Sequence, residues 1–239
     1  MSSAHATDAE EEYLQTLFWL EEAGLPMTAA NLARAMRLSA PTVHEMIGRL
    51  EGDGYIERAS NKSISFTKSG REHAEQTVRR HRMIERFLTD VLGVPWDEVH
   101  EEAERLEHAM SPVLEERMFA AIGDAKTCPH GHPIDSRDRI EGFPMADVEV
   151  GAKVTVLRFE NEAEDLLHYL RDSGLEPGVQ GTLQSSDDDT VVLRAANGTT
   201  CSITRSVAET VAVLADPAPA QRKPTLPEAL VFGGERYGR

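Results

Sequence analysis

The sequence has few cysteines and no long apolar run. Cys128 and Cys201 are the two cysteines in 239 residues, which excludes a disulfide framework and is typical of a reducing compartment. No apolar stretch approaches the roughly 20 residues that a membrane-spanning helix needs. The start, MSSAHATDAEEE, lacks the basic and apolar regions of a secretory signal. We therefore expect a cytoplasmic protein with no membrane partner.

Positive charge is scarce as well. The formal net charge is −16, so the chain as a whole is a poor generic binder of polyanions. Any surface for nucleic acid must be local. The length allows two or three small domains, each with a core of its own.

Residues 28–71 form a basic island, with seven Lys and Arg against four Asp and Glu. Thr28 and Ser39 are good N-caps for two successive helices, and Pro41 suits the first turn of the second. That helix ends near Gly52, and two β-like runs follow at 55–58 and 63–66. Helix, turn, helix and hairpin is the layout of a winged helix-turn-helix, and the basic excess suits DNA phosphates. A winged helix that makes only protein contacts is the alternative.

The second of these helices, about 39–52, is the expected recognition helix. Pro41 could contact a thymine methyl group, and Glu45 could accept a hydrogen bond from a cytosine amino group. Side chains near the start of such a helix meet base edges, whereas basic side chains around it bind phosphates. The candidates for base edges are Ser39, Pro41, Thr42 and Glu45, and those for phosphates are Arg37, Arg49 and Lys62.

Residues 99–112, VHEEAERLEHAMSP, carry two stripes if read as a helix. One stripe is apolar and contains Val99, Ala103, Leu106 and Met110. The adjacent sector, about 100° wide, contains two imidazoles and two carboxylates: His100, Glu104, Glu107 and His108. Packing the apolar stripe crowds the carboxylates, whose repulsion must be relieved by protons, water or a cation. The pattern indicates a metal site, with a solvated acidic face as the alternative.

Three helices are expected around this segment. Thr67 caps a long helix that runs to about residue 92, on which His81 and Glu85 share a face. Asp97 is expected to start the acidic helix, and Ser111 and Pro112 begin a third that reaches residue 123. So much apolar surface beside a DNA-binding module indicates dimerisation, and two-fold symmetry would let a homodimer read a palindrome.

The remainder divides into a loop, a β region and a tail. Cys128, His130 and His132 could ligate zinc, but a structured Pro/Gly loop is favoured because no fourth ligand stands at a recognisable spacing. From residue 146 the pattern predicts strands at 148–150, 154–157, 183, 191–193, 201–203 and 211–214, and a short helix at 166–170. Residues 217–239 are Pro-rich and basic, and we expect them to be disordered.

In this order of modules the chain resembles the diphtheria toxin repressor (DtxR) family of metal-dependent transcriptional regulators. The matching segments are SAPTVHEMIGRLEGDGYI, RRHRMIERFLTDVLG, VHEEAERLEHAMS and PHGHPI. The resemblance covers roughly residues 8–135, with a looser likeness to an SH3-like (FeoA-like) domain over 148–216. It implies a mainly α fold with a small β domain. The domains would be a winged helix-turn-helix (1–72), a helical dimerisation and metal-binding domain (73–145), an SH3-like barrel (146–216) and a tail (217–239).

The resemblance also implies two adjacent metal positions. The iron-type members have Met and Cys at the positions of Glu12 and Glu104, so the carboxylates here resemble the manganese-responsive branch. Gln15 stands where manganese-type relatives often have a carboxylate, which leaves the spacing of the two metals open. The implied primary ligands are Glu12, Glu104, Glu107 and His108, and the ancillary ones His81, Glu85 and His100, with a further oxygen from Glu160, Asn161, Glu162 or Glu164.

Together these features predict a metal-activated repressor of metal homeostasis genes that binds palindromic operators in double-stranded DNA as a homodimer. Oxygen and nitrogen donors suit Mn²⁺ or Fe²⁺, and Co²⁺, Ni²⁺ or Zn²⁺ could replace them in vitro. One alternative is a winged-helix regulator that senses an organic ligand. A carboxylate-bridged metalloenzyme is less favoured, because Glu104, Glu107 and His108 do not repeat the Glu-x-x-His pairs of di-iron helices. We therefore expect no enzyme activity.

Overall fold

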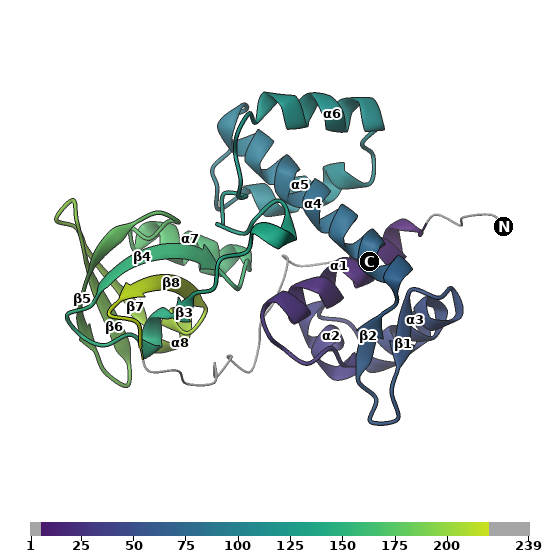
Figure 1. Ribbon diagram of the computed structural model, residues 1–239, viewed down its shortest axis with the longest axis horizontal. Coiled ribbons are helices and arrows are strands. Elements are labelled where there is room, and N and C mark those ends of the chain that lie inside the picture. Colours follow the sequence, from purple (N-terminus) through teal and green to yellow (C-terminus); the bar gives the residue numbers. More distant parts are fainter. Residues whose placement is uncertain (1–5, 220–239) are drawn as a thin grey trace.

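The computed structural model describes residues 6–219, which form three bodies in chain order. Figure 1 shows the β domain on one side, the winged helix on the other, and α4 leading from the winged helix into the helical region between them. The winged helix contains α1 (Asp8–Glu22), α2 (Ala29–Ala35), α3 (Ala40–Gly52), β1 (Ile56–Arg58) and β2 (Ile64–Phe66).

The caps of the winged helix are those that the sequence predicts. Thr28, Ser39 and Thr67 each accept a hydrogen bond from a backbone N–H in the first turn of the helix that follows. Such a bond satisfies one of the free donors at a helix start. The strands β1 and β2 pair as an antiparallel hairpin, and the core beneath them includes Leu14, Leu17, Leu32, Ile47 and Leu50, all fully buried.

The helical region contains α4 (Lys68–Asp90), α5 (Val99–Glu107) and α6 (Pro112–Ala121). Its core is built from Met83, Ile84, Val99 and Ala103. Two of the expected apolar positions behave differently from the prediction. Leu106 is 40 % exposed, so it does not pack in the core of this chain, and Met110 lies beyond the end of α5 and is only partly buried.

The start and end of α5 also correct the prediction. The helix ends at Glu107, and His108 occupies the C-cap position. Asp97 does not cap the helix, because the N-cap residue is Glu98, which makes no side-chain cap bond. Asp97 instead accepts a hydrogen bond from Arg171 of the β domain, a partner that local sequence does not reveal.

The β domain is a six-stranded sheet in the order β3-β8-β4-β5-β6-β7. All pairings within it are antiparallel. The elements are β3 (Phe143–Pro144), β4 (Lys153–Phe159), β5 (Gln180–Ser186), β6 (Thr190–Ala195), β7 (Thr200–Thr204) and β8 (Val211–Asp216), with α7 (Glu164–Asp172), α8 (Arg205–Ala208) and the 3-10 turns η1 (Ser136–Asp138) and η2 (Met145–Asp147).

The strand predicted at 148–150 is wrong. Val148 follows η2 and is buried in the core, while Val150 lies in a turn and is 58 % exposed. The turn ends at Gly151, whose φ of 92° suits glycine. The expected disorder of 217–239 falls almost wholly outside the described residues. Within residues 6–219 no helix is both long and apolar enough to cross a membrane.

Candidate metal centre

Helix α1 lies against the acidic and imidazole side chains of α4 and α5. The indole of Trp19 contacts two of the predicted ligand residues: its ring centroid is 5.5 Å from that of His81, with the planes at 72°, and 5.8 Å from that of His100. Trp19 is itself 6 % exposed. A helix of the winged-helix unit therefore forms one wall of the candidate site.

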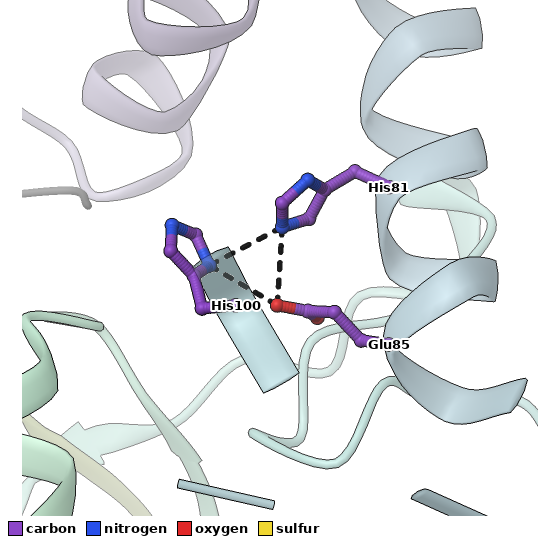
Figure 2. A group of neighbouring side chains, drawn as sticks. All are labelled: His81, Glu85 and His100. Atoms are coloured by element: carbon purple, nitrogen blue, oxygen red, sulfur yellow. Dashed lines mark hydrogen bonds and ion pairs between the residues drawn. The ribbon is translucent and has the colours of Figure 1, made fainter. Parts of the chain in front are cut away.

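His81, Glu85 and His100 meet in a buried group (Figure 2). The Nε2 atom of His81 lies 3.1 Å from Oε1 of Glu85 and 3.2 Å from Nδ1 of His100, which in turn lies 3.1 Å from the same carboxylate oxygen. His81 and Glu85 come from consecutive turns of α4, and His100 comes from the first turn of α5. We call this group, together with Glu162 and His130 described next, the inner cluster.

The β domain contributes one carboxylate to the inner cluster. Of the four oxygen donors considered from the sequence, Glu162 lies closest to the imidazoles, with Oε2 at 3.2 Å from Nδ1 of His100. Glu160 instead pairs with Arg139 and Arg158, and the side chain of Asn161 accepts a hydrogen bond from the backbone of Ala163. Glu164 lines a surface groove beside the cluster.

His130 reaches the inner cluster from the loop that the sequence analysis interpreted as structural. The loop is structured, as expected: the N–H of Cys128 donates to the carbonyl of His132 at 2.8 Å. Gly131 has a φ of 92°, and a Cβ there would lie 1.9 Å from the carbonyl oxygen of Leu157. Only glycine allows this close approach to β4, so the loop packs directly against the β domain at this turn.

The loop thereby turns one nitrogen of His130 toward the carboxylates. Its Nε2–H donates to the carbonyl of Trp96 at 2.8 Å, and its Nδ1 lies 3.3 Å from Oε1 of Glu85 and 3.6 Å from Oε1 of Glu162. Glu85, Cys128 and His130 each offer a ligand-type atom within 4.8 Å of one another. Sequence reasoning missed this proximity because the three segments meet only in the tertiary structure.

The charges of the inner cluster are strongly coupled. Burial works to raise the pKa of Glu85, but the imidazoles of His130 and His81 bring it well below its usual value. Burial likewise opposes charge on Glu162, yet His130 and His100 lower its pKa to about 2. His100 shows the converse: burial works to lower its pKa, but bonds to Glu162 and Glu85 raise it to about 10. Imidazolium protons therefore balance the carboxylates, and a divalent cation would compete with those protons.

Glu12, Glu107 and His108 lie together in a second, more open group, which we call, with the predicted ligand Glu104, the outer cluster. Nε2 of His108 lies 3.3 Å from Oε1 of Glu107 and 3.9 Å from Oε1 of Glu12. The side chains of Glu12 and His108 are 30 % and 16 % exposed, whereas Glu107 is buried. Glu104 lies beside an imidazole of the inner cluster, with Oε1 at 3.5 Å from Nε2 of His100.

The first turns of α1 add acidic groups that the sequence analysis did not name. Oε2 of Glu11 lies 3.4 Å from Nδ1 of His108, and Oδ1 of Asp8 lies 4.0 Å from the same atom. The nearby carboxylate of Glu11 raises the pKa of His108 despite its partial burial. The amide of Gln15 donates to Oε2 of Glu107 at 3.3 Å. The acidic residues at 8–12 could have indicated further metal ligands in the sequence. Acidic side chains are also common in the first turn of a helix, where they interact favourably with the helix dipole.

The two clusters touch. Nδ1 of His81 in the inner cluster lies 2.9 Å from Oε2 of Glu107 in the outer cluster. His100 is shared in the same way, since its Nδ1 faces Glu85 and its Nε2 faces Glu104. A change of charge in one cluster is therefore felt in the other.

The donor set fits a divalent cation. Several buried side-chain atoms have no hydrogen-bond partner, although ligand-type atoms surround them, and such atoms are costly unless an ion or water satisfies them. They include Glu85 Oε2, Glu107 Oε1, His100 Nε2, His108 Nδ1 and Nε2, and His130 Nδ1. Burial, together with nearby Glu85, raises the pKa of the Cys128 thiol to about 11, so oxygen and imidazole nitrogen dominate the set.

A third acidic group, Asp97, Glu98 and His168, joins α5 to the β domain. Asp97 lies 3.2 Å from Nε2 of His168 and also accepts a hydrogen bond from Arg171. Because the guanidinium already neutralises this carboxylate, the group acts as a domain contact.

The residues expected to contact DNA lie on α3, in the turn before it and in the wing. Ser39, Pro41, Thr42 and Glu45 are exposed at the start of α3, and Arg37 and Lys62 are exposed with φ values of 53° and 65°. A groove of about 610 Å³ lies between α3 and the wing, and Arg58, Asn61 and Lys62 are among its lining residues. Arg49 was predicted to contact a DNA phosphate. Its Nη2 lies 3.2 Å from Oε1 of Glu10 of α1, so Arg49 joins the recognition helix to α1.

Comparison with known proteins assigns each body to a described domain. Residues 5–64 match the family model "Iron dependent repressor, N-terminal DNA binding domain", residues 67–136 match "Iron dependent repressor, metal binding and dimerisation domain", and residues 143–214 match "FeoA domain". The expected fold class, with its winged helix and its SH3-like (FeoA-like) β domain, is therefore confirmed.

Individual proteins agree with these matches. The chain is 33 % identical over 202 residues to the iron-dependent repressor IdeR of Mycobacterium leprae, covering 78 % of this chain and 88 % of that protein. It is 39 % identical over 143 residues to the diphtheria toxin repressor of Corynebacterium diphtheriae, covering 60 % and 63 %. A solved manganese-dependent transcriptional repressor in complex with manganese superposes with a TM-score of 0.78 at 29 % identity, covering 86 % and 99 %.

Proposed function

We propose how metal and DNA are connected in this chain, which belongs to the iron-dependent repressor family and is a metal-dependent, DNA-binding transcriptional repressor. The family consists of transcriptional repressors that bind operator DNA as dimers, so the metalloenzyme alternative falls away. The organic-ligand alternative has no comparable support, because the predicted ligand residues His81, Glu85, His100 and Glu107 are buried together beside α1.

The outer cluster is the regulatory metal site in this proposal, and the inner cluster is the ancillary one. A bound divalent cation would neutralise the carboxylates of each cluster and join the elements that carry them. Glu12 of α1 would share the outer site with Glu104, Glu107 and His108. Glu162 of the β domain would share the inner site with His81, Glu85 and His100, and His130 would support it or serve as a further donor.

We propose Mn²⁺ as the physiological metal, with Fe²⁺ as the competitor to test. The outer cluster offers carboxylates and one imidazole but no thiolate or thioether, and such donors suit hard or borderline cations. The solved relative is described as manganese-dependent, while the mycobacterial and corynebacterial relatives are described as an iron-dependent repressor and a diphtheria toxin repressor. The choice therefore rests on the donor chemistry.

One observation carries the mechanism: α1 contacts both clusters and the recognition helix. Its Glu12 lies beside His108, its Trp19 lies against His81 and His100, and its Glu10 pairs with Arg49 of α3. Side chains that hold α1 against α4 and α5 therefore also set the position of α3. In a dimer this position decides whether two recognition helices fit successive half-sites of a palindrome.

Exposed apolar side chains at or near the ends of α4, α5 and α6 support dimerisation through this region. Large apolar side chains without cover in the single chain mark association surfaces, and here they come from the ends of three helices that face away from the core. They are Val91, Leu92, Leu106, Val113 and Leu114. A repressor that acts on DNA would work in the cytoplasm, where we place the protein.

The test is DNA affinity measured against free metal. A duplex is first selected from a random-sequence library with wild-type protein in Mn²⁺, and its affinity is then titrated against buffered Mn²⁺, Fe²⁺, Co²⁺, Ni²⁺ and Zn²⁺. We expect a palindromic duplex and tight binding only with metal. Equal affinity for the selected duplex after exhaustive chelation would refute the proposal.

A further inference from the structure

A buried network of charges links the three bodies of the molecule on the side of α1 that faces the β domain. Its members are Glu22 at the end of α1, Arg82 of α4, Arg139 before β3, Arg158 of β4, and Glu160 just after β4. Their side chains are between 3 % and 17 % exposed. None of them belongs to the inner or the outer cluster.

Arg139 occupies the centre of this network. Its Nη2 donates to the backbone carbonyl of Glu22 at 2.9 Å and to both carboxylate oxygens of Glu160, at 2.9 Å and 3.1 Å. Its Nη1 lies 3.8 Å from Oε1 of Glu22. One guanidinium therefore holds the last turn of α1 and the β domain together. The planar, multidentate donor of arginine suits this role, whereas the ammonium of lysine is a point charge.

The groups around Arg139 are themselves held in place. Arg82 pairs with Glu22 and donates to the carbonyl of Pro133 at 2.9 Å. Arg158 donates to Glu160 at 2.7 Å and to the carbonyl of Ile140 at 2.8 Å. Glu22 and Glu160 therefore each have a second arginine partner, Arg82 and Arg158 respectively. These partners orient the two carboxylates beside Arg139.

The network is connected to the inner cluster through the chain itself. Glu160 precedes Glu162 by two residues, and its N–H donates to the carbonyl of Thr210 at 2.8 Å, which ties this segment to the sheet. A movement of the β domain that withdraws Glu162 from His100 would carry Glu160 and Arg139 with it, because Arg158 also holds the carbonyl of Ile140. It would therefore break the bond from Arg139 to Glu22 of α1. The position of Glu162 in the inner cluster and the bond from Arg139 to Glu22 of α1 are therefore coupled.

We propose that Arg139 is a positioning residue through which the β domain acts on the DNA-binding unit. This inference rests on the proposed function, in which Glu162 shares the inner metal site and the position of α1 sets that of the recognition helices. When Glu162 is held in the inner cluster, Glu160 holds Arg139, and Arg139 fixes the end of α1 opposite to Glu12. Helix α1 is then fastened at both ends, by the outer cluster near its start and by Arg139 at its end.

The test compares full-length R139Q, E160Q and the R139Q/E160Q double variant with R137Q. Arg137 is a matched control, because it lies two residues away and pairs with Asp135 at the surface, with its side chain 86 % exposed. The readout is the activation ratio, defined as the affinity for the duplex selected with wild-type protein in saturating Mn²⁺ divided by the affinity after chelation. Equilibrium dialysis of Mn²⁺ and the oligomeric state are measured in parallel.

We expect each single variant to lower the activation ratio about tenfold, within the usual range of coupling between sites. The double variant should be no worse than either single one, because both remove the same contact. R137Q should match wild type, and R139K should recover only part of the ratio. A purely structural role would lower the affinities with and without metal together and leave their ratio unchanged.

Two results would overturn the inference. A wild-type activation ratio in R139Q and E160Q would show that the contact carries no signal, while the proposed function would stand. Additive losses in the double variant would show that Arg139 and Glu160 act separately. If wild-type protein itself bound the duplex equally with and without metal, the proposed function would fail, and the inference would fail with it.

Discussion

The inner and outer clusters use the same two kinds of side chain but differ in their surroundings. The inner cluster is built from the helical region, the loop that follows it and the β domain, with Trp19 of α1 as one wall. Its core residues His81, Glu85 and His100 are almost fully buried, and their atoms already lie about 3.1–3.2 Å apart. The outer cluster joins α1 to α5, is partly open to solvent, and leaves 3.9 Å between His108 and Glu12.

This difference separates two roles. A site that is already assembled changes its geometry little when a cation replaces protons, so its main effect is to stabilise the packing of the domains around it. A site whose donors come from two elements and lie farther apart can draw those elements together. Only differential affinity for the two arrangements shifts the equilibrium between them, so we assign the switch to the outer cluster and the anchoring of the β domain to the inner one.

The largest expected effect comes from removing an outer-cluster ligand. His108→Ala or Glu104→Ala should abolish metal-dependent binding to the selected duplex and leave the protein folded and dimeric, because the tie between α1 and α5 is lost. We expect the affinity in Mn²⁺ to fall at least to the level of the chelated wild type, a loss of roughly 100-fold if the coupling lies at the upper end of its usual range. Mobility-shift titration measures this loss.

The control for these variants is Glu102→Ala, a change to an exposed residue of the same helix that pairs with Arg105 at the surface. It should behave as wild type. If His108→Ala and Glu104→Ala kept the full metal response, the assignment of the switch to the outer cluster would be wrong.

Removal of metal should separate stability from DNA binding. Saturating the wild type at about 100 times the Kd adds about 2.7 kcal/mol to the free energy of unfolding for each site. Glu162→Gln should lose the share that belongs to the inner cluster, but retain metal-dependent DNA binding within about tenfold. Thermal unfolding with Mn²⁺ and after EDTA measures the first quantity, and mobility shift measures the second. Equal Mn²⁺ stabilisation in both proteins would contradict the role of Glu162.

A smaller effect is expected at His130. His130→Ala should weaken Mn²⁺ binding at the inner cluster about tenfold, as is typical for groups that orient or support metal ligands. It should affect the outer site less, because His130 faces Glu85 and Glu162 of the inner cluster. Isothermal titration calorimetry with Mn²⁺ measures this effect if the two sites differ in affinity, because the affinity of each site can then be followed separately. His44→Ala, at an exposed position of α3, is a control for loss of an imidazole elsewhere.

The smallest effects distinguish the two basic residues near the recognition helix. Lys62→Ala should weaken binding evenly across DNA sequences and reduce the slope of log affinity against log salt by about 1. Arg49→Ala should lower affinity only a few-fold, because its partly exposed pair with Glu10 is worth at most about 1 kcal/mol. It should also lower the metal activation ratio slightly, which Lys62→Ala should not. The same ratio in both variants would remove Arg49 from the link to α1.

Local features of the fold were predictable because they depend on neighbours in sequence. The caps at Thr28, Ser39 and Thr67 follow from side-chain chemistry at helix starts, and the pairing of His81 with Glu85 follows from helical spacing. The errors also have local causes. The apolar pattern continued past Glu107 although the helix ended there, and valines at 148–150 resembled a strand although a turn intervened.

By itself, the sequence determined the winged helix, the amphipathic helices and the ligand-type residues one turn apart, because these depend on periodicity and short-range hydrogen bonds. Only the tertiary structure selected Glu162 from four oxygen donors, brought His130 to Glu85, and placed Arg139 between α1 and the β domain. These contacts join segments far apart in the chain, and the packing of three cores and one tight glycine turn decides them. No spacing in the sequence encodes that packing.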